Sequence, residues 1–443
     1  MHPARIRHPP LLSAQKAPDP QTPMSILQSK YRTVRSTTRS LTARLSAEDQ
    51  LVQSCPEASP VKWYQAHTTW FFETFVLRPF LADYQPYPAD FPRIFYTDCV
   101  ALPEPIPEKQ LRTSFSRPSL EQVLAFRAHV DAAMERLLTS SIEAETSRRI
   151  LLGLHREQQH QELALTHIKH AFFSNPIHPA YHDPLPDRRP AHSLPRLRWH
   201  SVEGGLVEIG HSPNPHDPFD FCFDNETPRH RACLEPFQFA NRLVTCGEFL
   251  EFLADDAYSR PSLWLSDGWQ AVEQGKWEAP LYWERNSDDR TGWRIFTLRG
   301  WRGLSLLLDT PVGHISFFEA DAFARWRGCR LPTEVEWEFL AGREPCTGNL
   351  LDTGELHPRP ASGDGVEQLF GDCWEWTASA YTGYPGYAPL PGTLGECNGK
   401  FMSNRIVLRG GSCLTPAPHM RPTYRNFFRP ATRWQCSGIR LAV

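Results

Sequence analysis

Two histidines and an arginine stand close together in the segment LHREQQHQEL (154–163), a pattern that bears on metal binding. Residues four apart on an α-helix share a face, so Arg156 and His160 point the same way. The arginine guanidinium is always protonated and offers no lone pair to a metal ion. His155 lies about 140° from His160 around an ideal helix, so only a bulged turn would bring both imidazoles to one ion.

A third histidine, His67, lies in the aromatic segment WYQAHTTWFFE (63–73). Neutral imidazole is a common metal ligand, and iron, copper and zinc all accept it. Histidines on helices are also common as packed or solvated residues. The spacing alone therefore leaves a metal site and ordinary helix packing both open.

The elements that must position these residues are helical between about residues 26 and 175. Ser119 and Gln122 fit a capping box at the start of one helix. Apolar residues then recur at helical spacing, and they do so again between about 146 and 173. Together with the segment around 60–77, these patterns predict a four-helix bundle.

The composition differs on both sides of this bundle. Residues 1–25 hold repeated prolines and few apolar groups, which predicts a disordered tail. Residues 176–195 are proline-rich without periodicity, which is typical of a linker. Residues 196–443 are rich in Gly, Pro and Trp and have short strand-like runs at 204–210 and 405–412 and helical patterns at 244–253 and 316–328. The chain is therefore predicted to be an α+β protein with a second, mixed domain in 196–443.

Charge and cysteine usage limit the function classes. The net charge is only -3, which favours neither nucleic-acid binding nor attachment to a membrane surface. No run approaches the roughly 18 to 20 apolar residues of a membrane span. Eleven cysteines occur without a CxxC pair, which argues against a disulfide framework or a structural zinc site. We expect a cytoplasmic protein that acts on small molecules.

Long blocks of both halves resemble the ergothioneine-biosynthesis sulfoxide synthases. The helical blocks that resemble their DinB-like domain lie at 59–77, 116–134 and 151–173. The later blocks resemble their second domain and include GHISFFEADAFARWRGCRLPTEVEWEFLAG (313–342), LFGDCWEWTASAY (369–381) and RPTYRNFFRPATRWQCSGIRL (421–441). The resemblance covers nearly everything after residue 25. It implies a DinB-like four-helix bundle followed by an α+β domain like that of formylglycine-generating enzymes and C-type lectins.

The resemblance also implies a chemistry. The family joins a thiol, as a sulfoxide, to the imidazole of hercynine, the trimethylated betaine of histidine, using oxygen and a non-haem Fe(II) held by three imidazoles. His67 takes the first ligand position and His160 the third, whereas Arg156 occupies the second. The third ligand here would be His155, through a bulged helix, or water.

The same resemblance implies a set of substrate residues. Gln159 matches the residue that hydrogen-bonds the hercynine imidazole, and Arg112 is placed to take a substrate carboxylate. Asn426, Phe427 and Phe428 match the pocket for the ring and its trimethylammonium group, which aromatic faces attract. In FYTDC (95–99), Asp98 and Cys99 replace a tyrosine pair that would donate a proton.

Alternatives remain at this point. The chain is expected to couple sulfur to hercynine, or to join selenium or another thiol donor instead. A second possibility is a metal-deficient betaine-binding protein in which Arg156 replaces the charge of the ion. A third, based on the second domain alone, is an activity like that of formylglycine-generating enzymes, and fold analogy alone does not set function.

Overall fold

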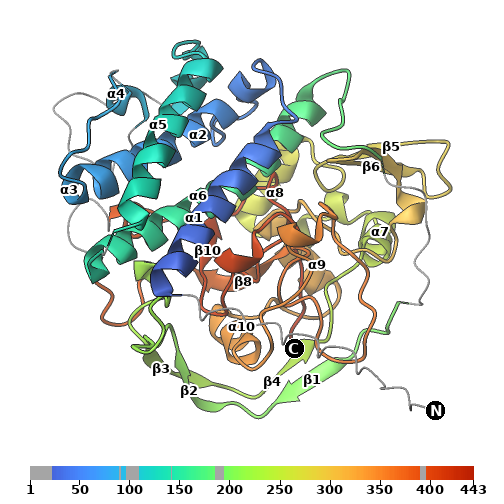
Figure 1. Ribbon diagram of the computed structural model, residues 1–443. Coiled ribbons are helices and arrows are strands. Elements are labelled where there is room, and N and C mark those ends of the chain that lie inside the picture. The colour runs from blue at the N-terminus through green and yellow to red at the C-terminus, as the bar shows by residue number, and fades with distance from the viewer. Residues whose placement is uncertain (1–21, 89–90, 96–108, 141, 185–193, 390–395) are drawn as a thin grey trace, which may run out of the picture.

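The computed structural model describes residues 22–88, 91–95, 109–140, 142–184, 194–389 and 396–443. Within them, helices make up the N-terminal half, and short sheets with further helices make up the C-terminal half (Figure 1). The predicted α+β fold class is confirmed. Among the described residues, no helix has both the length and the apolar character needed to cross a bilayer.

Four long helices form the N-terminal bundle: α1 (Pro23–Thr42), α2 (Val61–Phe72), α5 (Leu120–Leu138) and α6 (Ala144–Ser174). A π-helical turn (Glu73–Leu77) and α3 (Arg78–Phe80) continue α2, and α4 (Pro92–Phe95) is a single turn. Ser119 and Gln122 exchange the hydrogen bonds of a capping box at the start of α5, as predicted. Helix α1 already begins at Pro23, two residues before the predicted end of the tail.

The C-terminal half is built around a four-stranded sheet with the order β10-β9-β8-β11. Its strands are β8 (Trp374–Ala380), β9 (Ile406–Arg409), β10 (Asn426–Phe428) and β11 (Ser437–Gly438). Smaller sheets pair β1 (Trp199–Val202) with β4 (Phe237–Ala240) and β2 (Gly205–Ile209) with β3 (His230–Leu234), and join β5 (Trp283–Arg285), β6 (Trp293–Thr297) and β7 (Gly300–Gly303). Strands β2 and β9 lie within the strand-like runs predicted at 204–210 and 405–412.

Helices pack around these sheets: α7 (Cys246–Ala254), α8 (Ser266–Gly275), α9 (Phe317–Trp326), α10 (Glu334–Ala341) and α11 (Glu396–Gly399). The sequence predicted α7 and α9 but not α8 and α10. Buried arginines in this half pair with buried glutamates, because an unpaired charge in the interior would be costly. The pairs are Arg409 with Glu338, Arg425 with Glu334, and Arg440 with Glu375.

Helix α6 joins the two halves through a buried carboxylate. Glu162 accepts hydrogen bonds from Nε1 of Trp374 at 2.7 Å, Oγ of Ser412 at 2.6 Å and Oγ1 of Thr415 at 2.8 Å. All three donors come from the C-terminal half: Trp374 is the first residue of β8, and Ser412 and Thr415 follow β9. This contact fixes α6 against the sheet and, with it, the residues that α6 presents.

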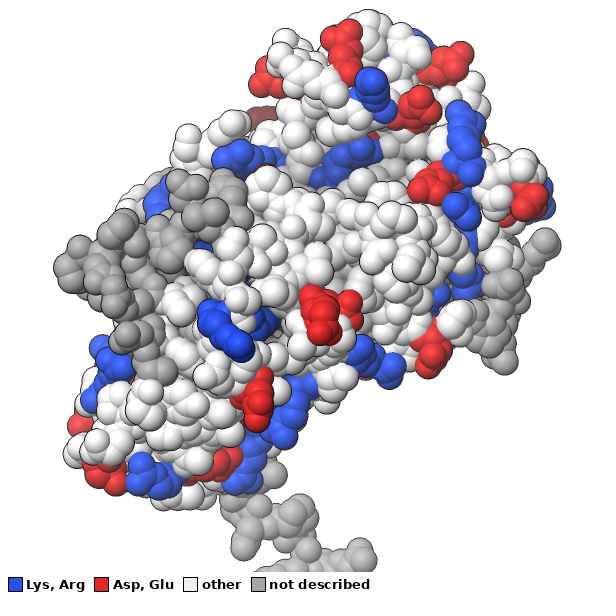
Figure 2. Space-filling model, turned by 90° about the horizontal axis from the view of Figure 1, so that it is seen from above, with Lys and Arg blue, Asp and Glu red and all other residues white. Residues whose placement is uncertain are grey.

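Part of the predicted linker is described, and it lies against both halves. The backbone N–H of Tyr181 donates to the carbonyl of Leu298 at 2.9 Å, and its hydroxyl donates to the carbonyl of Leu41 at 2.8 Å. On the face drawn in Figure 2, acidic and basic side chains are interspersed, in keeping with the small net charge.

Candidate functional site

The structure brings His67 of α2 and His160 of α6 together, with their ring centroids 5.3 Å apart. Nδ1 of His67 lies 2.6 Å from the carbonyl oxygen of Phe95, and Nδ1 of His160 lies 2.7 Å from that of Arg156. A carbonyl only accepts, so each Nδ1 carries the proton and each Nε2 keeps its lone pair. This is the form in which imidazole binds a metal ion.

Both imidazoles are held in the neutral state. Burial lowers the pKa of His67 well below its ordinary value, and repulsion from His160 adds to this effect. Burial likewise lowers the pKa of His160 to about 4, although its hydrogen bond to the carbonyl of Arg156 acts in the opposite direction. Near neutral pH, neither imidazole would therefore take up a second proton, and both Nε2 atoms would stay available to a metal ion.

A small glycine lets the two helices approach. A Cβ atom on Gly153 of α6 would lie 2.7 Å from the ring of Phe72 on α2, a distance that no ordinary contact allows. Glycine at this position removes that clash and permits the close packing of α2 on α6. The histidine pair sits further along the same helix interface.

Arg156 lies beside this pair because α6 is α-helical from Ala144 to Ser174. Its guanidinium carbon is 5.5 Å from the ring centroid of Phe71, and its charge contributes to the lowered pKa of both His67 and His160. Burial lowers the pKa of Arg156 itself to about 10, while attraction to Asp224 opposes the shift. The regular helix thus puts a cation, not a ligand, one turn from His160.

His155 is not brought to the pair. Its ring stacks on Phe221 with centroids 4.0 Å apart, and its Nδ1 lies 3.1 Å from Nδ1 of His419. The bulge that would have turned it toward His160 is absent from the continuous helix α6, so the angle of about 140° between the two residues remains. His155 instead lines a separate cavity of about 990 Å³ between the two halves. Our prediction of His155 as third ligand needs this correction.

The donor set around the pair is therefore incomplete. Among the described residues, no three His, Cys, Asp or Glu side chains gather in a group that could hold a metal ion. The cavity next to His160, which Tyr64 and Gln161 also line, has a volume of about 10 Å³. That is space for about one water molecule. Two imidazoles with free Nε2 atoms fit part of an Fe(II) site, and Arg156 cannot supply the rest.

Arg112 reaches the same site through Trp63. The indole of Trp63 stacks on His67 with centroids 4.5 Å apart, and the Arg112 guanidinium lies 3.8 Å from the Trp63 ring centroid. Arg112 also donates to Oγ of Ser59 at 2.8 Å. Its charge contributes to the lowered pKa of both His67 and His160, so it is a second cation near the pair.

The C-terminal half reaches the pair through a series of aromatic contacts. Phe428 of β10 packs on Trp434 with centroids 5.2 Å apart, and Trp434 packs on His167 of α6 at 4.7 Å. Nδ1 of His167 lies 2.5 Å from the hydroxyl of Tyr64, whose ring is 5.1 Å from that of His160. Strand β10 is thereby tied to the histidine pair.

The other predicted substrate residues do not share one set of contacts. Phe427 points to the opposite face of β10 from Phe428 and stacks on Tyr381 with centroids 4.0 Å apart. Asn426 accepts a hydrogen bond from the backbone N–H of Phe427, and Gln159 is half-buried next to His160. The predicted proton donors Asp98 and Cys99 lie outside the described residues.

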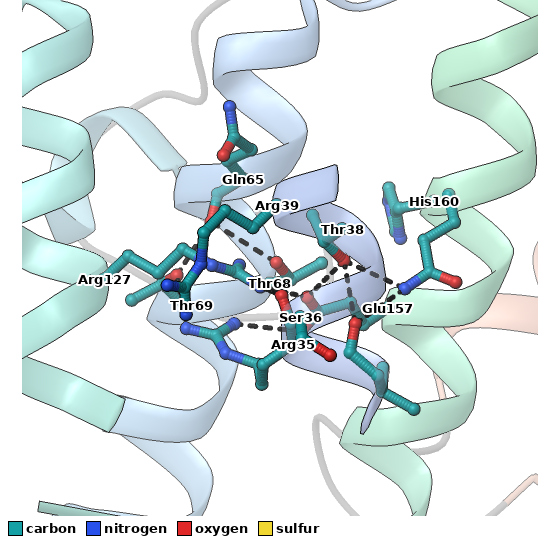
Figure 3. A network of polar contacts seen from close by, with 12 residues as sticks. Arg35, Ser36, Thr38, Arg39, Gln65, Thr68, Thr69, Arg127, Glu157 and His160 are labelled. Carbon is teal, nitrogen blue, oxygen red and sulfur yellow. Dashed lines mark hydrogen bonds and ion pairs between the residues drawn. The ribbon is translucent and has the colours of Figure 1, made fainter. Parts of the chain in front are cut away.

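A buried ionic network surrounds Glu157, which lies about one helical turn before His160 on α6 (Figure 3). Glu157 of α6 is bound by Arg35 at 2.9 Å, by Arg127 at 2.5 Å and by the hydroxyl of Thr38 at 2.6 Å. These partners come from α1 and α5, so the carboxylate links three helices. It fixes the turn of α6 that ends at His160.

We expect Glu157→Gln to destabilise the fold by about 3 kcal/mol at pH 7. Burial works against ionisation, but the charges of Arg127 and Arg35 outweigh it and lower the pKa of Glu157 from 4.5 to about 2. A lowered carboxyl pKa contributes stability above pH 4.5, and that contribution is lost as the pH falls toward 2. Urea unfolding of both proteins between pH 7 and pH 2 measures this. Equal pH dependence in the two proteins would rule the account out.

Several of these residues were not singled out from the sequence: Trp63, Tyr64, His167, Trp434 and Asp224. Trp63 and Tyr64 carry a local signal, since each lies about one helical turn before His67. His167 is seven residues after His160, two turns along the same side of α6. Nothing local to Trp434 or Asp224 indicates that they approach α6, because that contact depends on how the two halves dock.

Comparisons with known proteins agree with this two-part architecture. Residues 185–350 and 356–443 match the family described as "Sulfatase-modifying factor enzyme 1-like domain", and residues 30–172 match the DinB superfamily. The hercynine oxygenase of Mycobacterium tuberculosis (strain ATCC 25618 / H37Rv) is 35% identical over 243 residues, which cover 49% of this chain and 55% of that protein.

Two further relatives are similar over comparable lengths. The hercynine oxygenase of Mycolicibacterium smegmatis is 32% identical over 291 residues, which cover 58% of this chain and 63% of that protein. Ergothioneine biosynthesis protein 1 of Schizosaccharomyces pombe is 26% identical over 270 residues, which cover 58% of this chain and 32% of that protein. The matched part thus spans less than two-thirds of each relative. By its matched residues, this chain belongs to the sulfatase-modifying factor enzyme 1-like domain family and carries a DinB-superfamily domain in its N-terminal half.

Proposed function

We propose that this protein is an oxygenase of ergothioneine-type biosynthesis that forms a carbon–sulfur bond at the imidazole of hercynine. The observation that supports it most is the pair His67 and His160, two neutral imidazoles with protonated Nδ1 and free Nε2 atoms. The relatives named hercynine oxygenase support hercynine as the substrate, and the relative named ergothioneine biosynthesis protein 1 supports the type of biosynthesis. The activity would be cytoplasmic and would involve small molecules only.

Fe(II) is the proposed cofactor, and His67 and His160 would hold it through Nε2. When bound, iron would supply the activation of oxygen and of a thiolate. Water and substrates would have to occupy the remaining positions, since Arg156 has no lone pair to give. With fewer protein ligands the ion would be held weakly, and the backbone carbonyls of Phe95 and Arg156 would keep the two imidazoles oriented.

The residues of the second half would bind hercynine. Phe428 and the neighbouring Trp434 offer aromatic faces to the trimethylammonium group, which is attracted to them without a hydrogen bond. Asn426, on the same face of β10 as Phe428, would complete the pocket, and Gln159 would hydrogen-bond the hercynine imidazole. Phe427 stacks on Tyr381 on the other face of the strand and would only support the pocket from there. Arg112 would pair with a substrate carboxylate, as its position near His67 allows. Asp98 and Cys99 remain the proposed proton donors.

The test is a product assay with defined donors. Purified protein is loaded anaerobically with Fe(II), mixed with hercynine and cysteine, glutamylcysteine or a selenium compound, and exposed to oxygen. We expect a product with a new bond between the chalcogen and the imidazole carbon, detected by mass spectrometry and abolished by a chelator. Failure with every donor, in protein that has bound iron, would contradict the proposal.

Arg156 supports a second candidate, a metal-deficient protein that binds the betaine. Its guanidinium, on a half-buried residue, lies where the family would place a ligand and would serve as a fixed positive charge for the carboxylate of hercynine or another anion. Calorimetry separates the two functions. Hercynine binding that is equally tight with iron and with chelator, combined with no turnover, favours the binding protein.

Phe428→Leu should weaken hercynine binding about fivefold, because it removes one aromatic face from the cation. The matched control is Phe339→Leu, which changes a half-buried phenylalanine of α10 whose ring faces Arg343 outside the site. Calorimetric titration with hercynine measures both variants. Equal affinities for the two variants would remove Phe428 from the proposed pocket.

A further inference from the structure

Three cysteines of the C-terminal half meet beside α6, apart from the histidine pair. Sγ of Cys436 lies 4.0 Å from Sγ of Cys373 and 3.9 Å from Sγ of Cys413. All three residues are almost fully buried. Cys373 directly precedes β8, Cys413 follows β9, and Cys436 directly precedes β11. Neither the proposed function nor the ligand set uses them.

A buried lysine and histidine accompany the sulfur atoms. Nζ of Lys169 on α6 lies 2.7 Å from Nε2 of His314, and both side chains are buried. An ammonium group only donates, so Nε2 accepts and the ring proton of His314 sits on Nδ1. Burial lowers the pKa of Lys169 to about 8, although attraction to the three cysteines acts in the opposite direction. The lysine is therefore cationic near neutral pH and compensates a negative charge on sulfur.

Cys436 is the sulfur that this arrangement favours as a thiolate. Hydrogen bonds from the thiols of Cys373 and Cys413 lower the pKa of Cys436 well below its usual value, against the effect of burial, and His314 contributes further. The opposite holds for its neighbours, since burial raises the pKa of Cys373 and of Cys413. In its thiol form, Cys436 instead donates to the carbonyl of Asp372 at 3.5 Å.

The backbone favours Cys373 as the partner of this thiolate. Ser437 pairs with Trp374 and Gly438 with Glu375 in parallel register, so Cys373 and Cys436 are opposite each other one step earlier. Neighbouring strands lie about 4.8 Å apart, which is within the roughly 4.4 to 6.8 Å that a disulfide needs between Cα atoms. The described cysteines are not grouped as a metal site. Side-chain rotation alone would have to close the remaining gap of about 2 Å between the sulfur atoms.

We infer that Cys436 is an oxidisable nucleophile that forms a disulfide with Cys373 when the protein meets hydrogen peroxide. The Cys436 thiolate attacks one peroxide oxygen, the O–O bond breaks, and a sulfenic acid and hydroxide result. The Cys373 thiol then attacks the Cys436 sulfur, the S–O bond breaks, and water leaves. Two thiols are oxidised to one disulfide, and one peroxide is reduced to two waters. The assignment of this modification site does not rest on the proposed oxygenase activity.

Oxidation of Cys436 would change the aromatic contacts of the candidate site. Trp434 is two residues before Cys436 and packs on both His167 and Phe428. A shift of Cys436 toward Cys373 would move the segment that carries this indole. The cysteines thus couple a redox change to the aromatic contacts that connect β10 with the histidine pair.

The test treats the full-length protein with excess hydrogen peroxide, alkylates remaining thiols after denaturation, and maps peptides by mass spectrometry. Cys246 is the internal control, because it is equally buried but its Sγ contacts Thr310 and Pro311 and burial raises its pKa. We expect a linked Cys373–Cys436 peptide and loss of free Cys436 at least about tenfold faster than loss of free Cys246.

Two variants keep the result interpretable. Cys373→Ser should allow the sulfenic acid of Cys436 to be trapped by a dimedone probe, and Lys169→Met should slow the oxidation of Cys436 about tenfold. A Cys436 that stays as free as Cys246 in the wild-type protein would overturn the inference. A wild-type disulfide between Cys436 and Cys413 in place of Cys373 would overturn it as well.

Discussion

His160→Ala should abolish Fe(II) binding and lower the rate of hercynine oxidation by at least about a thousandfold, the effect of roughly 4 kcal/mol. Among the residues that the structure describes, no further His, Cys, Asp or Glu joins His67 and His160 beside Arg156 to complete a metal site. Losing one of two ligands leaves a single imidazole, which cannot hold the ion against water. Anaerobic equilibrium dialysis with Fe(II), followed by the product assay, measures both effects.

His155→Ala is the matched control, since it removes a histidine of the same helix that stacks on Phe221 away from the pair. We expect this variant to bind as much Fe(II) as the wild-type protein. If His155→Ala loses iron and His160→Ala keeps it, the assignment of the pair is wrong. Circular dichroism of both variants checks that α6 remains folded.

Arg156→His should tighten Fe(II) binding at least tenfold, or about 1.4 kcal/mol. A histidine at this position would lie one turn from His160 on the same face of an unbroken helix. The substitution also removes a half-buried positive charge whose repulsion opposes a divalent cation. Anaerobic titration with Fe(II) gives the affinity, and oxygen consumption with hercynine shows whether turnover rises.

Arg156→Met separates these two contributions. It removes the charge and keeps a long apolar side chain against Phe71, but it supplies no imidazole. An intermediate gain for Arg156→Met and a larger gain for Arg156→His are expected. Unchanged affinity in both variants would show that position 156 does not face the ion.

The helices of the bundle could be predicted because their signals are local. The capping box at Ser119 and the apolar periodicity of α6 are properties of neighbouring residues, and both proved correct. Helix α10 was missed although Thr333 and Glu336 form its capping box, because only eight residues follow the cap. Helix α8 lacks a side-chain cap and has a glycine at 268, so its sequence carries little helical signal.

The candidate site was predictable only where it follows helical geometry. The spacing correctly indicated that a regular helix would turn Arg156 toward His160 and His155 away. The family resemblance suggested that His67 and His160 meet, which no local pattern determines. The route from Phe428 through Trp434 and His167 depends on the docking of two domains, and Glu162 holds that docking through partners more than 200 residues away.

The most direct test of the account is a crystal structure of the protein grown anaerobically with Fe(II) and hercynine, with anomalous data collected at the iron edge. The account predicts one iron atom at bonding distance from Nε2 of both His67 and His160, with Arg156 beside it. Anomalous density elsewhere, or iron below about a tenth of an equivalent in the same protein, would contradict the central claim that this pair holds the metal.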